Sequence, residues 1–327
     1  MVGFQQDDTM TANQKLIAGC ISGVTTRFIT QPFDVIKIRT QLSKQALGNK
    51  HKTALQTCNK ILREEGITAF WQGHNLGQIH SIVAISSQFY VYEISTKYVH
   101  RHYFSSDKYS NTYKKTLIFC CGIFAGCCSA TLTVPLEVIR TRQMLVKDQY
   151  KGLFNGAKAV YRSGGVLAFY EGWIAGMLQL GPSIGIAFAV FRFVQPLVLS
   201  YLHQCNGDCK HSKTNPPKPE NILLASSIAG SVAGFVSKTA TYPLELAKRR
   251  LQIGSHIADD KFKAPSTSRN LVKCTKLSDC LTHTLRKEGF WGLYRGWEVT
   301  IYKSQVYSVI AFTTYELVCY FIRDFEK

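Results

Sequence analysis

Three segments of this sequence carry an acidic and a basic side chain at the same short spacing after a proline. The shared pattern is Pro-x-acid-x-x-base-x-base, and it occurs at residues 32–39, 135–142 and 243–250. Residues three positions apart lie on one face of a helix, so each copy presents a carboxylate beside a cation. Such groups form ion pairs, either within one helix or between neighbouring helices. The residues concerned are Asp34, Lys37, Glu137, Arg140, Glu245 and Lys248.

Each copy of this pattern belongs to a longer repeat. A Gly-x-x-x-Gly pair precedes each proline, and such small residues let helices pack closely in a membrane. A Gly-x4-aromatic-x-Gly motif follows downstream and opens a further apolar segment. The repeats predict six long helices with a short amphipathic helix inside each repeat. The long helices are expected near residues 12–41, 74–100, 113–143, 173–202, 219–251 and 297–323.

The boundaries of the repeats follow from the polar connectors between them. We expect a first repeat at 12–105, a second at 112–206 and a third at 219–325. The third repeat has an extra polar segment at 254–276, which we interpret as a surface insertion.

The composition limits what these helices can do. Lys and Arg number 39 against 21 Asp and Glu, and the net charge of +18 suits nucleic acid, anionic lipid or a small anion. No basic run of five residues and no aromatic-basic platform is present, which argues against nucleic acid. Mean hydropathy is only −0.04, and isolated basic residues interrupt the apolar segments. Helices that line a polar cavity fit this pattern better than helices surrounded by lipid.

The sequence offers no pattern typical of catalysis or of metal binding. It lacks a nucleophile elbow, a Walker loop, a paired-carboxylate site and a standard zinc-ligand spacing. We therefore expect neither an enzyme, nor a cofactor, nor a metal site. The N-terminal segment MVGFQQDDTM has the features of neither a secretory signal nor a transit peptide, so any targeting signal is expected to be internal.

The repeated motifs resemble those of the mitochondrial carrier family over nearly the whole chain. The family signature is Pro-x-Asp/Glu-x-x-Lys/Arg-x-Lys/Arg, followed by acid-Gly-x4-aromatic-Lys/Arg-Gly. This sequence departs from it at Gly164, where the family has an acid, and at Gln72 and Glu171, where it has a base. The resemblance implies an all-α protein of the mitochondrial inner membrane with six transmembrane helices. These would form three tandem repeats with pseudo-threefold symmetry, with short amphipathic helices on the matrix side.

The resemblance also implies two gates. On the matrix side, each acid would reach a base of another repeat: Asp34 with Arg140, Glu137 with Lys248 and Glu245 with Lys37. On the cytoplasmic side, the family places an acid and a base three residues apart on the even-numbered helices. Here those positions hold Glu93 with Thr96, Arg192 with Gln195, and Glu316 with Cys319. Because only Arg192 can pair with a Glu, we predict a weak cytoplasmic gate that opens easily.

Positions that differ between the repeats are the ones that can contact an asymmetric substrate. Arg27 and Lys238 lie five residues before their prolines, where the second repeat has Ala130. The resemblance adds contacts on the even-numbered helices at His80, Gln179, Leu180 and Lys303. Arg27, Lys238 and Lys303 would direct three positive charges into one cavity, which suits a diphosphate. Gln88 offers a donor and an acceptor to an aminopyrimidine.

The runs QPFDVIKIRTQL and VSKTATYPLELAKRRLQ are most similar to family members that transport thiamine pyrophosphate. The resemblance therefore implies import of thiamine pyrophosphate into the matrix by alternating access, in exchange for nucleotides. The alternatives are another phosphorylated anion, such as a nucleotide, a deoxynucleotide or coenzyme A, or a membrane receptor without transport. The other expected partner is membrane lipid, with cardiolipin as the candidate, and a monomer is expected to be sufficient.

Overall fold

The computed structural model describes residues 12–42, 54–104, 111–145, 150, 152–205, 219–253 and 276–325, and every element within these ranges is helical. Their long helices differ from the expected bounds by no more than three residues, so the six predicted helices are confirmed. The expected insertion at 254–276 lies outside the described residues except at its last position. The long helices are α1 (Ala12–Leu42), α3 (His74–Val99), α4 (Asn111–Leu145), α6 (Trp173–Cys205), α7 (Pro219–Leu251) and α10 (Trp297–Phe325).

Short helices connect the two long helices of each repeat. They are α2 (Ala54–Glu65), α5 (Leu153–Gly164) and α9 (Leu277–Gly292). The 3₁₀ helices η1 (Ile67–Trp71) and η3 (Val166–Tyr170) follow the first two of them, and η2 (His100–Phe104) extends α3. The amphipathic character expected for the short helices is visible in α5, which buries Val160 while Tyr161 stays exposed.

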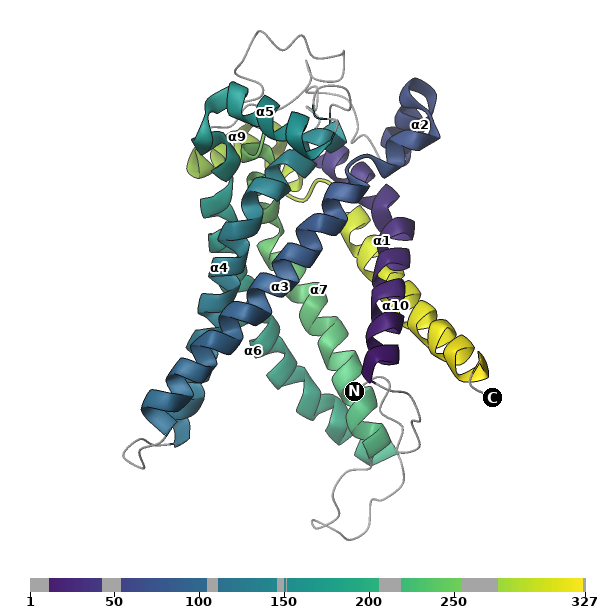
Figure 1. Ribbon diagram of the computed structural model, residues 1–327, viewed down its shortest axis with the longest axis vertical. Coiled ribbons are helices and arrows are strands. Elements are labelled where there is room, and N and C mark those ends of the chain that lie inside the picture. Colours follow the sequence, from purple (N-terminus) through teal and green to yellow (C-terminus); the bar gives the residue numbers. More distant parts are fainter. Residues whose placement is uncertain are drawn as a thin grey trace.

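The long helices converge at one end of the molecule, where the short helices lie, and splay apart towards the other end (Figure 1). They pack in three pairs: α1 with α10, α3 with α4, and α6 with α7. Each pair joins two different repeats, so the third repeat closes back onto the first. The start of α1 and the end of α10 lie at the splayed end (Figure 1).

The main apolar core lies at the converged end. Val35, Val138 and Met144 are fully buried there, just beyond Pro32 and Pro135, which lie inside α1 and α4. A proline within a helix removes one backbone hydrogen bond and allows the helix to bend. The bends let the ends of these helices approach one another.

The outer surface suits a membrane environment. By length and apolar composition, the described segments Thr116–Leu145, Val166–Leu202 and Trp297–Ile322 could each cross a membrane. Large apolar side chains such as Phe89 and Phe193 are 70% and 71% exposed on the long helices. Apolar surface this extensive is covered by lipid in a membrane protein.

Two glycines of the second repeat adopt a conformation that other residues rarely tolerate. Gly165 and Gly172 have φ angles of +67° and +78°. A Cβ atom at Gly172 would lie 2.8 Å from the backbone oxygen of Lys248 on α7, whereas one at Gly165 would meet nothing within 4 Å. Gly172 therefore allows α6 to begin directly against α7.

We expect Gly172→Ala to destabilise the protein more than Gly165→Ala. Both substitutions introduce backbone strain of about 1–3 kcal/mol, but only Gly172→Ala adds a clash with a backbone carbonyl. Thermal unfolding of the two purified variants in the same detergent compares the two effects. Equal losses would show that the approach of α6 to α7 is not limited by this contact.

Candidate functional site

Three ion pairs link the three repeats at the converged end of the bundle. Arg140 Nη2 lies 3.0 Å from Asp34 Oδ2, Lys248 Nζ lies 2.8 Å from Glu137 Oε1, and Lys37 binds Glu245. None of the six side chains is more than 18% exposed. These are the pairs that the resemblance implied, and each of them joins two helices. We call this set the ion-pair ring.

Two further cations join the ion-pair ring. Arg249 Nη1 lies 2.8 Å from Glu137 Oε1, and Lys303 Nζ of α10 lies 2.5 Å from Asp34 Oδ1. The described residues therefore place five cations on three carboxylates. Lys303 was expected only as a substrate contact, and Arg249 was not singled out at all. The signal for Arg249 was its position between the two bases of its motif.

The last base of each motif forms a second cyclic set. Each arginine donates from Nε to a backbone carbonyl at the C-terminal end of the first long helix of another repeat, from α1 to α4, from α4 to α7 and from α7 to α1. The acceptors are Met144 O for Arg39 at 2.9 Å, Gln252 O for Arg142 at 3.0 Å, and Gln41 O for Arg250 at 3.4 Å. The carbonyls at a helix end lack partners within the helix, so these arginines join the repeats through the backbone.

Each of these arginines also binds an acid of its own repeat. The Nη2 atoms of Arg39, Arg142 and Arg250 lie 2.8 Å from Glu65, Glu171 and Glu288 respectively.

The departures from the family signature are compensated within this arrangement. The second repeat has Gly164 where the other repeats have an acid, and Glu171 supplies the missing carboxylate from the later position. In the first repeat, the Gln72 side chain accepts from Arg39 at 2.9 Å and donates to Glu65 at 3.2 Å. Both departures therefore preserve the contacts of the buried arginine.

Several predicted substrate contacts lie next to the ion-pair ring. Arg27 and Lys238 precede the ring acids of their helices by two helical turns, towards the splayed end. Arg27 donates to the backbone oxygen of Gly77 at 2.7 Å. Lys238 is exposed, and it lies close enough to Glu245 for their charges to interact. His80 is half-buried, and its Nδ1 atom has no hydrogen-bond partner among the described residues.

The remaining predicted contacts are less constrained. Gln179 is half-buried on α6, Leu180 follows it with an exposed side chain, and Gln88 is exposed on α3. Their roles in substrate binding stay predictions.

The residues expected to form the cytoplasmic gate are not joined in this conformation. Glu93 binds Lys97 of its own helix at 2.6 Å, and both side chains are exposed. Arg192 and Glu316 are exposed on α6 and α10, and no ion pair among the described residues links either of them to another helix. Sequence reasoning missed Lys97, although its spacing of four residues from Glu93 is typical of a helical ion pair. The gate at this end stays a prediction.

This protein is a helical membrane bundle of three repeats. Ion pairs close the bundle at one end, and the cations Arg27 and Lys238 lie on the splayed side of these pairs. Such an arrangement is typical of a solute carrier. The family profile described as "Mitochondrial carrier protein" matches residues 8–103, 112–202 and 220–325. The chain belongs to the mitochondrial carrier family. This membership confirms the family expected from the motifs, the class of transporter and the location in the mitochondrial inner membrane.

Curated relatives match almost the whole chain. The mitochondrial thiamine pyrophosphate carriers of Macaca fascicularis and Homo sapiens are each 35% identical over 332 residues, covering 98% of this chain and 96% of the relative. The mitochondrial thiamine pyrophosphate carrier 1 of Phaeosphaeria nodorum is 30% identical, covering 96% of this chain and 94% of the relative.

Exchanging the charges of Lys37 and Glu245 tests the ion-pair ring. This pair is suitable because Lys37 is the one ion-pair partner of Glu245 among the described residues. Lys37→Glu and Glu245→Lys should each destabilise the protein by about 3–5 kcal/mol, because each leaves a buried charge unpaired. The double variant should recover much of the loss. A double-mutant cycle on thermal stability and on transport measures the coupling.

The matched control is the same exchange at Lys60 and Glu64, an exposed pair 3.8 Å apart on α2. Exposed ion pairs contribute little to stability, so neither single substitution there should change the thermal stability or the transport rate appreciably. A Lys37→Glu/Glu245→Lys variant no better than its single variants would contradict the assigned pairing.

Proposed function

We propose that this protein imports thiamine pyrophosphate into the mitochondrial matrix by alternating access, in exchange for nucleotides. The curated relatives named for this substrate cover nearly the full chain. The observation that carries the proposal is the excess of cations at the ion-pair ring, where Lys303 shares Asp34 with Arg140. A diphosphate would balance the positive charge that the three carboxylates of the ring leave uncompensated.

The position of Lys303 connects substrate binding to the matrix gate. Lys303 belongs to the third repeat and Asp34 to the first, so their ion pair is a link between repeats. A diphosphate that enters from the splayed side competes with Asp34 for the ammonium group of Lys303. When it succeeds, this link is lost, and the interface between α1 and α10 is weakened. A ligand shifts a conformational equilibrium by its differential affinity for the two states, and the exchange of partners at Lys303 supplies that difference.

Further parts of the proposal concern organisation and partners. The gates are formed by the ion-pair ring on the matrix side and by Glu93, Arg192 and Glu316 on the cytoplasmic side. The repeats span 12–105, 112–206 and 219–325, and one copy of the chain is sufficient for transport. Cardiolipin is the candidate among the surrounding lipids. The protein acts as a transporter without enzymatic activity.

Uptake of labelled thiamine pyrophosphate into liposomes tests the proposal directly. The purified protein is reconstituted, and the liposomes contain thiamine pyrophosphate, a nucleotide, coenzyme A or buffer alone. We expect saturable uptake that depends on internal thiamine pyrophosphate or nucleotide. Exchange of nucleotides or coenzyme A without uptake of thiamine pyrophosphate would contradict the substrate assignment and leave the carrier class intact.

Removal of the Lys303 charge tests its role in binding. Lys303→Gln should lower the kcat/KM of thiamine pyrophosphate uptake by about tenfold or more, because a hydrogen bond to a charged group contributes about 1.5–3 kcal/mol. Lys60→Gln is the matched control, since Lys60 is exposed on α2 and forms its ion pair with Glu64 of the same helix. Equal uptake by Lys303→Gln and wild type would remove Lys303 from the site.

A further inference from the structure

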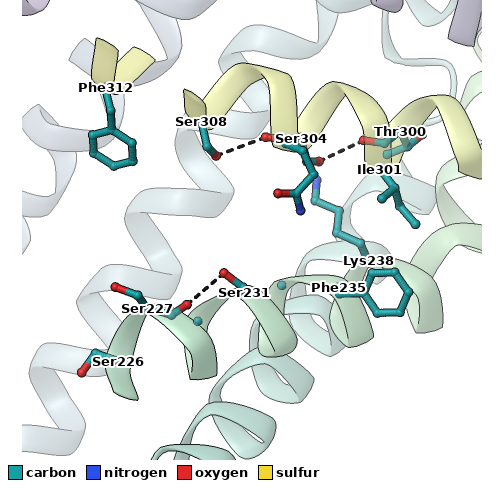
Figure 2. Close-up of a pocket in the computed structure, with 13 residues that line it drawn as sticks. Ser226, Ser227, Ser231, Phe235, Lys238, Thr300, Ile301, Ser304, Ser308 and Phe312 are labelled. Atoms are coloured by element: carbon teal, nitrogen blue, oxygen red, sulfur yellow. Dashed lines mark hydrogen bonds between the residues drawn. The ribbon is translucent and has the colours of Figure 1, made fainter. Parts of the chain in front are cut away.

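A cavity with both apolar and polar side chains lies between α7 and α10, and Lys238 is among the residues that line it. Its volume is about 530 Å³, which is within the range of small-molecule sites. The two helices belong to the same repeat and face each other across it (Figure 2). The side chains that decide its chemistry are Ser231, Phe235 and Lys238 of α7 and Ser304, Gln305 and Ser308 of α10.

Lys238 gives the cavity a positive end. It is the one charged side chain that lines the cavity among the described residues, and no ion pair or hydrogen bond joins it to a carboxylate there. In Figure 2 its side chain extends from α7 towards α10. A phosphate group bound at this end would therefore meet an ammonium group that forms no direct ion pair among the described residues.

Three serine hydroxyl groups supply hydrogen-bond acceptors to the rest of the cavity. Ser304 Oγ donates to Thr300 O at 2.9 Å, Ser308 Oγ to Ser304 O at 3.1 Å, and Ser231 Oγ to Ser227 O at 2.9 Å. Each hydroxyl has a single hydrogen, so these three are used within their own helices (Figure 2). Their oxygen lone pairs stay available, and the wall therefore accepts hydrogen bonds from N–H groups.

We propose that this cavity is the subsite for the amino-substituted heteroaromatic ring of the substrate. The exocyclic amine of the ring donates one of its two hydrogens to Ser231 of α7 and the other to Ser304 of α10, while Lys238 holds the phosphate end. The inference rests on the proposed function and deepens it, because it assigns the aminopyrimidine of thiamine pyrophosphate to the gap between α7 and α10. In this inference the ring contacts α7 and α10 rather than Gln88 of α3. The same chemistry admits the amino group of a nucleotide base.

The discrimination between two closely matched substrates tests this subsite. Oxythiamine pyrophosphate carries an oxygen in place of the exocyclic amine of thiamine pyrophosphate, with the same diphosphate. Wild-type protein in liposomes should prefer the amine, measured as the ratio of the two kcat/KM values. In Ser231→Ala/Ser304→Ala this preference should fall by about fivefold for each of the two lost hydrogen bonds, because a net hydrogen bond contributes about 1 kcal/mol. Since the ratio is taken within one variant, the amount of folded protein cancels.

Two control variants show whether a change in preference is due to the loss of hydroxyl oxygens in the cavity. Ser200→Ala removes a hydroxyl that donates to Pro196 O at 2.8 Å on α6, away from the cavity, and should keep the wild-type preference. Ser304→Thr keeps the oxygen and should keep the preference as well. If the double variant is inactive, the single variants Ser231→Ala and Ser304→Ala are measured in its place. A variant lacking these oxygens that discriminates as well as wild type overturns the subsite, whereas a wild type without uptake of thiamine pyrophosphate overturns the proposed function.

Discussion

The ion-pair ring is the constraint on which the closed end of this carrier depends. Asp34, Glu137 and Glu245 are largely buried on three different helices, and each finds its cation in another repeat. A buried carboxylate without a partner is costly, so no repeat can move away from its neighbours without finding new partners for its charges. The helices accordingly converge at the end that holds this ring and splay apart towards the other end (Figure 1).

The buried arginines extend this constraint from side chains to the backbone. Arg142 and Arg250 are fully buried, and each binds both a carbonyl of a neighbouring repeat and an acid of its own. The negative end of the helix dipole favours a cation at this position. The requirement is for one acid near each arginine rather than for an acid at one sequence position. The second repeat therefore functions with Gly164 and Glu171, where the others use Glu65 or Glu288.

The repeats predicted the helices and the charged positions of the ring well. The pairing between helices was implied by the resemblance to the family, because repetition alone leaves pairing within one helix open. Equivalent positions can be recognised by aligning the three copies of the motif, and the fold then brings the equivalent residues together. The ion pair between Lys303 and Asp34 joins positions that are not equivalent, so a comparison of repeats does not find it. The cavity was missed for a related reason. Whether Ser231 and Ser304 face each other depends on the rotation of α7 relative to α10, which spacing along one chain does not determine.

The uneven distribution of cations makes the closed end responsive to an anion. Glu245 has Lys37 alone among the described residues, whereas Asp34 has both Arg140 and Lys303. An anion that withdraws Lys37 would leave a buried carboxylate unpaired, at a cost of about 3–5 kcal/mol. An anion that withdraws Lys303 leaves Asp34 still paired with Arg140, so that cost does not arise. The asymmetry therefore favours substrate binding at α10 and preserves all three pairs of the ion-pair ring until the conformation changes.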